Sequence, residues 1–441
     1  MPKKLPVLFY CLFVVGAAFA QESPGLIQLQ KHIAQHSGKM VDSTVTRFSN
    51  RYKKRINYLM PLYIGLQNGK RIRHFNTDKS YYDNLSDYSS FIGDYPSALY
   101  YTTKSYETLD MEAAATIKPF IDSLKQLDIQ HVPAKKYILD RAAHVQVTMI
   151  NEAHSKPLHR AFTISLLQDM YKLGYRYLAM EALNNTPSAT ADTILNVNTG
   201  FFTNEPVCAE MVRVAKEIGY TVYAYEDTLA YKHSGSVRDS IQAANIYQLI
   251  QQNPSAKILV HAGYGHISEE QIVDYVPMAM YFKKISGINP LTVNQTDMTE
   301  GSDFAYGRSF YEAYMKAFPV TVPSVAVYKN KPVDLLASSE YDISIIHPPT
   351  NYKNKRPDWY SLDGMRKELA VKPTEKSLFL VQAYYYKEYN KLEKDYLIPA
   401  DQTYTSAENG YYYLYLQPGK YKIVMRDIEY KVLSEGDMEM K

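Results

Sequence analysis

The chain has 441 residues, which suggests two to four domains at roughly 100–200 residues each. Hydrophobic residues make up 46% and charged residues 22%, values that exclude a wholly disordered chain. Lys and Arg number 49 and Asp and Glu 46, so the net charge of +3 leaves no strong field to attract nucleic acid or an anionic membrane surface. The 42 tyrosines suit half-wet binding surfaces, but a compositional habit explains them equally well.

Residues 1–20 have the pattern of a secretory signal peptide. Lys3 and Lys4 supply the positive end, the apolar run that continues through Ala18 is too short to span a bilayer, and Ala20 is a small residue at the cleavage position. We therefore expect cleavage near Ala20 and an exported protein, periplasmic or secreted. No later stretch approaches the ~18 uninterrupted apolar residues of a transmembrane segment. Cleavage leaves Cys208 as the only cysteine, so no intramolecular disulfide is expected.

Residues 21–135 carry helical patterns. The segment near 80–108 resembles a tetratricopeptide-type (TPR-like) hairpin, with Gly93 at the turn and Tyr and Ala residues packing across it. The chain has one such unit, whereas a stable array of stacked repeats needs about three or more. We therefore expect a helical cap on the next domain rather than a peptide-binding solenoid.

Residues 136–320 alternate between short apolar runs and longer helical patterns. Strands are expected at 144–150, 175–180, 221–225 and 257–260, and helices at 157–173, 206–218 and 237–251. Alternation of strands and helices at this spacing implies right-handed crossovers between parallel strands. The predicted fold class is α/β, a mostly parallel sheet with helices on both faces.

Residues 321–441 are rich in strand and turn signals, with candidate strands at 377–386, 411–416 and 421–425. Pro418-Gly419 indicates a tight hairpin. We expect a small C-terminal β-rich domain, either one sheet or a sandwich. Its aromatic run around Tyr412 fits an ordinary sheet face, or a surface for a glycan or a protein partner.

Residues that can carry chemistry fall at the ends of the four predicted strands. The first strand is followed by Glu152 and His154, the second by Glu181, the third by Glu226 and the fourth by a loop with His266. In an open parallel sheet, ligands bind outside the carboxyl ends of the strands. We therefore expect these side chains to share one edge of the sheet and to form the functional site.

A carboxylate and an imidazole held together can activate water, with the carboxylate fixing the imidazole tautomer. The same groups can ligate a divalent metal, which lowers the pKa of bound water. Arg238 opens the third helix and is placed to pair with a strand-end carboxylate or to hold an oxyanion. Gly263 and Gly265 let the backbone turn sharply and present His266. The chain has no Gly-x-Ser-x-Gly nucleophile elbow, so a serine-hydrolase route is not supported.

Five nearby residues have plainer explanations. His144 begins a strand at the opposite edge, so a structural role is expected. His159 fits either a supporting hydrogen-bond donor or a surface residue. Glu226 fits a cap for the segment that follows, His233 a solvated loop residue, and His261 a buried strand residue with satisfied hydrogen bonds.

At these residues the sequence resembles the superfamily that contains erythromycin-esterase-like proteins, ChaN-type haem-binding proteins and the TraB/Tiki metalloproteases. The pattern of that superfamily is Gly-Glu-x-His after the first strand, a glutamate ending the second, an arginine near a later helix and a histidine in a Gly-rich strand end. The four elements match, in order, Asn151-Glu152-Ala153-His154, Glu181, Arg238 and Gly263-Tyr264-Gly265-His266, with Asn151 in place of the first glycine. The resemblance covers residues 140–300.

The resemblance implies the fold and the position of the site, but the branches of the superfamily differ in the reaction. The esterase branch implies hydrolysis by an activated water with His154 as base. The Tiki branch implies a divalent metal held by Glu152, His154, Glu181 and His266. The ChaN branch implies haem binding without turnover, for which Tyr264 is well placed because tyrosinate ligates ferric haem.

We expect an exported hydrolase that cleaves an ester or amide bond in a small-molecule or peptide substrate. His154 would be the general base or a metal ligand, and Glu152 and Glu181 would orient it or complete the metal shell. His266 would be a second base or ligand, and Arg238 would stabilise developing negative charge. The alternatives are a haem- or ligand-binding protein without catalysis, and an interaction module whose strand-end residues tolerate substitution.

Overall fold

The computed structural model describes residues 21–36, 57–105, 114–185, 194–230, 232–271, 273–302, 307–335 and 340–441. The expected signal peptide, residues 1–20, lies outside these ranges. Within them, every helix is too short or too polar to cross a membrane. Cys208 is a buried free thiol.

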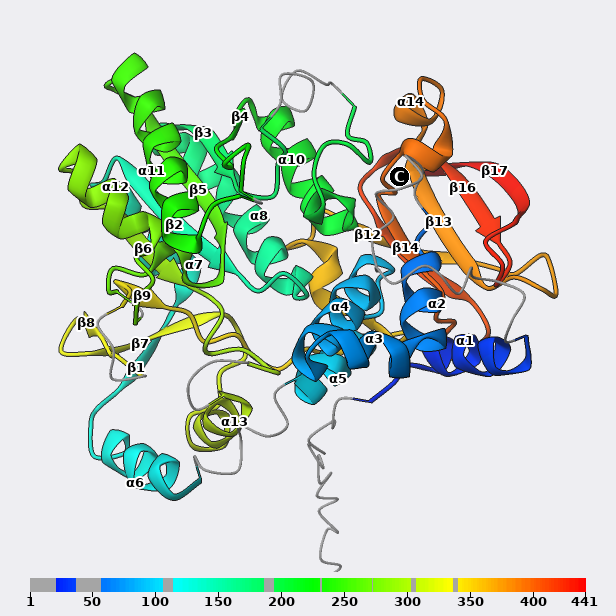
Figure 1. The fold of residues 1–441 in the computed structure, drawn as a ribbon, viewed down its shortest axis with the longest axis horizontal. Helices are drawn as coiled ribbons and strands as arrows, with labels where there is room; N and C mark the ends of the chain where they lie inside the picture. Colours follow the sequence, from blue (N-terminus) through cyan, green and yellow to red (C-terminus); the bar gives the residue numbers. More distant parts are fainter. Residues whose placement is uncertain are drawn as a thin grey trace, which may run out of the picture.

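A six-stranded parallel sheet forms the centre of the α/β part of the molecule (Figure 1). Its strands are, in spatial order, β4 (Thr221–Ala224), β3 (Tyr175–Met180), β5 (Lys257–Gly263), β2 (Val147–Glu152), β6 (Leu291–Asn294) and β9 (Ile343–Ser344). Every neighbouring pair in this order is parallel. The predicted α/β fold class is confirmed.

Helices cover both faces of this sheet because successive strand residues point to opposite sides. Met149 of β2 packs in a core with α11 (Gly235–Gln252) and α12 (Met278–Ser286), and its neighbour Ile150 packs in a second core with the helices of the other face. Those helices are α7 (Ala134–Ala142), α8 (Pro157–Lys172) and α10 (Pro206–Ile218). The chain moves from β2 through α8 and α10 towards β4, then returns through α11 to β5, so right-handed crossovers place the two helix sets on opposite faces.

The helices predicted for this region agree closely with those of the structure. Pro157 occupies the first turn of α8, and α10 ends at Gly219 in the left-handed region with φ 112°. The fourth strand is longer than expected, because β5 continues beyond residue 260 to Gly263. His261 pairs with Met180 of β3, and Gly263 pairs with Glu152 of β2.

The described residues of the N-terminal region form six helices, and Figure 1 shows most of them beside the C-terminal sheets. They are α1 (Pro24–Gln35), α2 (Met60–Gln67), α3 (Gly69–Phe75), α4 (Asp78–Phe91), α5 (Tyr95–Ser105) and α6 (Ala114–Leu124). Helices α4 and α5 form a hairpin in the segment expected to be TPR-like, and the turn between them contains Gly93 with φ 79°. The Ser86 hydroxyl donates a 2.7 Å hydrogen bond across the hairpin to the Ala98 carbonyl.

The expected start of the C-terminal β-rich part at residue 321 does not coincide with a boundary between sheets. Strand β7 (Ser324–Tyr328) lies between β1 (Gln130–Pro133) and β8 (Lys331–Pro332), and β1 precedes the central sheet in the chain. Strand β9 completes the central sheet beside β6. Two-residue strands such as β8 and β9 leave no periodic signal, so the pattern alone could not assign them. The helix before β7 is α13 (Gly307–Ala317).

The C-terminal strands form two sheets that share one apolar core. One sheet pairs β12 (Lys367–Val371) with β15 (Tyr412–Leu416), and the other has the order β14 (Asp401–Thr403), β13 (Leu380–Tyr385), β16 (Gly419–Arg426) and β17 (Val432–Met440). The other elements of the C-terminal part are the pair β10 (Tyr352–Lys353) and β11 (Arg356–Pro357), the helix α14 (Tyr386–Tyr389), and the 3-10 helices η4 (Asp358–Ser361) and η5 (Lys394–Tyr396). Two further 3-10 helices, η2 (Phe202–Asn204) and η3 (Tyr264–Ile267), lie in the α/β part.

The predicted tight hairpin at Pro418-Gly419 is wrong. Strands β15 and β16 flank these residues but belong to different sheets. Leu414 and Ile423 lie in the shared core, so the turn passes from one layer to the other. The Pro-Gly dipeptide indicates that the chain reverses direction there. The two strands stack in different layers instead of pairing, because stacking buries the apolar faces of both.

Buried polar contacts join the C-terminal sheets to the rest of the chain. Arg366 pairs with Glu210 of α10 at 3.2 Å, and both side chains are at most 1% exposed. Arg356 donates to the Gly93 carbonyl of the helical hairpin at 2.9 Å. The N-terminal hairpin is therefore fixed against the body of the protein by the C-terminal layer, and it lies next to the central domain (Figure 1).

Candidate functional site

The first half of the site is a histidine–carboxylate pair at the end of β2. Glu152 is the last residue of the strand and is 3% exposed, and its Oε1 lies 3.2 Å from Nδ1 of His154, which is 22% exposed. The His154 ring stacks on Phe202 with a centroid distance of 3.9 Å. Because Nδ1 donates to the carboxylate, Nε2 is left as the acceptor of the ring.

Arg160 of α8 holds this pair in place. Its Nε and Nη2 donate to the two oxygens of Glu152 at 2.6 and 2.7 Å, and Nη2 also donates to the His154 carbonyl at 3.0 Å. Its Nη1 donates to Glu205 at 3.0 Å, so one buried guanidinium faces two carboxylates. Burial would raise the pKa of Glu152, but Arg160 and His261 outweigh it and hold the pKa well below its usual range. Glu152 is therefore a fixed anion beneath His154.

Gly263 connects this pair to the second carboxylate. The register of β3 and β5 brings Glu181 beside the backbone of β5, where its Oε2 accepts the Gly263 N–H at 2.6 Å. A Cβ atom at Gly263 would lie 2.4 Å from Cε1 of His154 and 3.2 Å from Oε2 of Glu181. Only glycine allows the His154 ring and the Glu181 carboxylate to approach this backbone together.

Arg238 organises the second half of the site. Its Nη2 donates to Glu181 Oε1 at 2.5 Å, and its Nε donates to Glu226 Oε1 at 3.0 Å. Its side chain is 25% exposed. Burial would raise the pKa of Glu181, but His266, Arg238 and His154 outweigh it and lower the pKa to about 2.

His266 is held by Asp239 and Tyr275. Its Nδ1 lies 2.8 Å from Oδ2 of the fully buried Asp239, which also accepts the Tyr275 hydroxyl at 2.5 Å. Its Nε2 lies between Glu181 Oε1 at 3.4 Å and Arg238 Nη1 at 3.2 Å. Burial and Arg238 would lower the pKa of His266, but Glu181 and Asp239 outweigh them and raise it.

The structure thus brings all five residues expected to be catalytic to the carboxyl edge of the sheet. Glu152 and His154 form one cluster, and Glu181, Arg238 and His266 form the other. The clusters meet at the backbone of Gly263. Their roles in a reaction are argued below as a proposal.

The residues with plainer explanations divide between the site and its surroundings. His144 is exposed and precedes β2, at the opposite edge from the site. His159 is fully buried and accepts the Ala153 N–H on Nδ1 at 3.0 Å, so it is neither a donor on that nitrogen nor a surface residue. His233 is not simply solvated, because Nδ1 lies 2.5 Å from Asp227.

Two more of these residues lie within the site. Glu226 contacts Arg238 instead of only capping the next segment. His261 is buried, and its Nε2 lies 3.7 Å from Glu152 Oε2. That nitrogen makes no hydrogen bond within the described part of the chain, so the expectation of satisfied hydrogen bonds does not hold for it.

Several site residues were missed from sequence. They are Arg160, Phe202, Glu205, Asp239 and Tyr275. Arg160 was detectable, because it lies in the first turn of a helix that follows a site strand, as Arg238 does. Asp239 directly follows Arg238 and offered a similar signal. Nothing local marks Phe202 or Tyr275, since the 3-10 helix η2 (Phe202–Asn204) and a segment after β5, respectively, bring them to the site from elsewhere in the chain.

The expected metal ligands are already engaged by arginines. Both oxygens of Glu152 pair with Arg160, and Glu181 pairs with Arg238. Among the residues that the structure describes, no group of three or more His, Cys, Asp or Glu side chains has the arrangement of a metal site. A divalent cation beside two guanidinium groups would meet strong repulsion, so this donor set does not fit one.

The expected haem ligand, Tyr264, lies beside His154. The Tyr264 ring packs edge-on against the His154 ring with centroids 5.0 Å apart, and the residue has φ 42°. Its backbone carbonyl accepts a 2.9 Å hydrogen bond from Asn151. Haem binding through Tyr264 stays a prediction.

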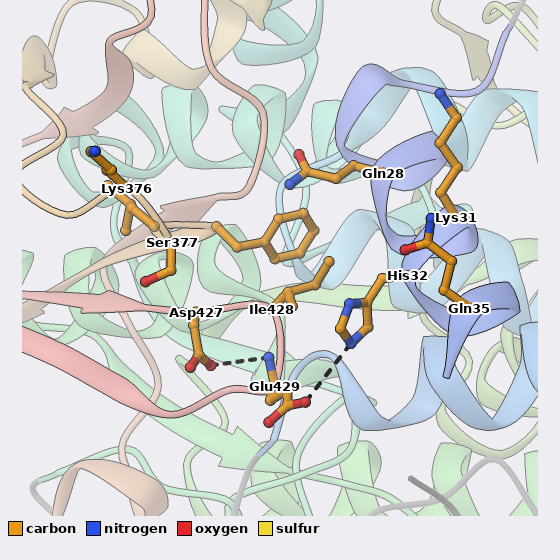
Figure 2. A pocket seen from close by; sticks show the side chains of 11 residues that line it. Gln28, Lys31, His32, Gln35, Lys376, Ser377, Asp427, Ile428 and Glu429 are labelled. Atoms are coloured by element: carbon orange, nitrogen blue, oxygen red, sulfur yellow. Dashed lines mark hydrogen bonds and ion pairs between the residues drawn. The ribbon is translucent and has the colours of Figure 1, made fainter. Parts of the chain in front are cut away.

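A separate cavity of about 380 Å³ lies between α1 and two C-terminal loops (Figure 2). Figure 2 shows His32 and Glu429 pointing towards one another, with His32 Nε2 4.0 Å from Glu429 Oε1. Burial lowers the pKa of His32, and Glu429 only partly offsets it. At that distance the Glu429 carboxylate does not form a hydrogen bond that would hold the His32 ring in place. The cavity therefore lacks a hydrogen-bonded histidine–carboxylate pair like the one at the strand ends.

Comparison with known proteins gives no identity for the chain: no protein-family model matches it, and neither does any curated protein.

Proposed function

We propose that the protein is an exported hydrolase that cleaves an ester or amide bond with a water molecule activated by His154. The observation that carries this proposal is the 3.2 Å contact between His154 Nδ1 and a buried Glu152 that Arg160 keeps ionised. The resemblance to the erythromycin-esterase branch, at Glu152, His154, Glu181, Arg238 and His266, supports it.

The Glu152–His154 pair has the geometry of a general base. Glu152 accepts from Nδ1 and thereby leaves Nε2 unprotonated, and Nε2 can take a proton from water as the water oxygen attacks the carbonyl carbon. The ring then becomes cationic, and the adjacent anion stabilises it. The stacked Phe202 ring covers one face of the imidazole and restricts its rotation.

The second half of the site supplies positive charge. Arg238 is 25% exposed, whereas Arg160 is fully buried, so Arg238 is the arginine that a substrate can reach. The carboxylates of Glu181 and Glu226 hold its guanidinium in place. Burial would lower the pKa of His266, but Glu181 and Asp239 outweigh it and raise the pKa, so these carboxylates favour the cationic form of the ring beside Arg238. Together Arg238 and His266 can stabilise the oxyanion that forms when water adds to the carbonyl group.

The pairing of both carboxylates with arginines favours a reaction without a metal. No step of the mechanism therefore passes through one. The substrate class that follows is a small molecule or a peptide with an ester or amide bond, and the expected signal peptide places the reaction in the periplasm or outside the cell.

A panel of esters and short peptides, assayed with and without a chelator, tests the proposal. His154→Ala should lower turnover by at least about 10²-fold and leave the melting temperature nearly unchanged, because the side chain is partly exposed. His144→Ala is the matched control and should behave as the native protein does. Unaltered hydrolysis by His154→Ala would refute the proposal, and activity that a chelator removes and a metal restores would reinstate the metal ligands.

A further inference from the structure

The turn after β5 holds an aromatic residue in a backbone conformation that favours glycine. Tyr264 has φ 42°, in the left-handed region, where a bulky side chain costs free energy and glycine costs little. It is the first residue of η3, which also carries His266. Its ring meets the His154 ring edge-on, with centroids 5.0 Å apart. The conformation of this one residue therefore sets where an aromatic ring lies against the proposed base.

Two hydrogen bonds hold the backbone on either side of Tyr264. The Gly263 N–H donates to Oε2 of Glu181 at 2.6 Å, and the Tyr264 carbonyl accepts from Nδ2 of Asn151 at 2.9 Å. The first bond lies before the φ torsion of Tyr264 in the chain, and the second lies after it. Side chains from outside the turn therefore hold its unfavourable conformation, as is common for strained residues at functional sites.

Asn151 is oriented to donate at this point. It is fully buried in β2, and its Oδ1 accepts the Gln295 N–H at 2.7 Å, so the amide presents Nδ2 to the Tyr264 carbonyl. Nδ2 also donates to Oδ1 of Asn294 at 2.9 Å. The side chain thus ties the turn after β5 to the end of β6, the two strands that flank β2 in the sheet. Glycine, which the Gly-Glu-x-His pattern has at this position, could form none of these bonds.

We propose that Asn151 is a positioning residue, which holds Tyr264 in the left-handed conformation and thereby keeps the His154 ring in place. This inference rests on the proposed function. Phe202 stacks on one face of the His154 ring at 3.9 Å, Glu152 holds its Nδ1, and Tyr264 contacts it from a further side. The three contacts together restrict the rotation of a side chain that is 22% exposed.

The effect of Asn151 should appear in the chemical step and not in substrate binding. Asn151 is fully buried, so a substrate cannot reach it. Without its amide, the backbone at Tyr264 can relax out of the left-handed region, and the Tyr264 ring then no longer restricts His154. A misplaced base lowers the rate of proton transfer and leaves ground-state binding largely unchanged.

A double-mutant cycle separates this link from a general structural role. Asn151→Gly and Tyr264→Gly should each lower kcat on the same ester by about 10- to 30-fold, and Asn151→Gly should change KM by less than ~3-fold. The double variant should lose no more than the weaker single variant, because glycine adopts the left-handed conformation without help from Asn151. Losses that multiply would show that Asn151 acts through other contacts, and would overturn the proposal.

Asn253→Gly is the matched control. The Nδ2 of Asn253 contacts the Tyr177 hydroxyl at 3.3 Å, where the chain leaves α11 and approaches the start of β5. This variant should leave kcat unchanged, both alone and combined with Tyr264→Gly.

Denaturant titration gives a second readout that needs no substrate. Asn151→Gly should lower the free energy of unfolding less in the Tyr264→Gly background than in the native one. If Asn151→Gly alone is too unstable to assay, the double variant should recover a cooperative unfolding transition. An equal cost in both backgrounds, or two unfolded variants, would overturn the link. If His154→Ala is inactive in the same assays, such a result removes the role of Asn151 alone, whereas an active His154→Ala removes the proposed function itself.

Discussion

The two histidines of the site have similar partners but different surroundings. His154 contacts Glu152, whose charge Arg160 already balances, and among the described residues no carboxylate forms a hydrogen bond with its other nitrogen. His266 contacts Asp239 through Nδ1 and lies near Glu181 through Nε2, so carboxylates approach both of its nitrogens. The first arrangement leaves a proton acceptor, and the second favours an imidazolium.

The difference shows that an imidazole–carboxylate pair does not define a role by itself. The role of the histidine depends on whether an arginine also pairs with the carboxylate. Arg160 donates to both oxygens of Glu152 and balances its charge, and Glu152 still orients His154 through Nδ1. In the part of the chain that the structure describes, no arginine pairs with Asp239; it accepts from the Tyr275 hydroxyl and the Met278 N–H, both neutral donors. Its full charge therefore acts on His266.

The largest expected effect comes from removing the charge of each carboxylate in turn. Glu152→Gln should lower kcat/KM by about 10³- to 10⁴-fold, because the His154 tautomer is no longer fixed. It should also lower the free energy of unfolding by about 3 kcal/mol, because Arg160 keeps a buried charge with one partner fewer. Asp239→Asn should lower kcat/KM by only about tenfold, because in the proposed mechanism His266 contributes charge and does not transfer a proton. Steady-state kinetics and denaturant titration measure both quantities.

Comparing the activities of Glu152→Gln and Asp239→Asn shows which histidine is the base. If Asp239→Asn loses more activity than Glu152→Gln, His266 is the base and the assignment is reversed. Equal losses would mean that both histidines transfer protons.

A smaller effect is expected from the backbone contact that the two halves share. In Gly263→Ala the new Cβ would lie 2.4 Å from Cε1 of His154, so the ring must move. A displacement of the base by about 1 Å costs on the order of 10²-fold in rate. Gly436→Ala on β17 is the control, because its Cβ would meet nothing within 4 Å. Full activity of Gly263→Ala would show that His154 does not depend on this position.

The central sheet and about half of the site residues could be predicted from the sequence. The strands before Glu152 and Glu181 and the helices from Pro157 and Pro206 have clear apolar periods and capping residues, and they lie where expected. Parallel strands deliver their ends to one edge by topology alone, so Glu152, His154, Glu181 and His266 could be grouped without coordinates.

The residues that position His154 and His266 could not be grouped from the sequence in this way. Phe202 lies in the short 3-10 helix η2 and Tyr275 in a connecting segment, and the positions of both depend on packing against distant elements. Strand β9 and the layer change at Gly419 were missed for a similar reason, because burial against distant elements overrides a local turn or strand signal.

The smallest expected effect is a pH dependence of stability that comes from His266. The folded-state pKa of His266 is raised above the ordinary 6.5, since Glu181 and Asp239 outweigh burial. Its contribution to stability is therefore fully present below pH 6.5 and is lost as the pH rises through the folded-state value. The difference in unfolding free energy between the native protein and His266→Gln should shrink over that range, by about 1.4 kcal/mol for each unit of raised pKa. His144→Gln, at the exposed opposite edge, should show no such slope. A difference that grows with pH would mean that His266 is neutral in the folded protein, and the cationic half of the site would then rest on Arg238 alone.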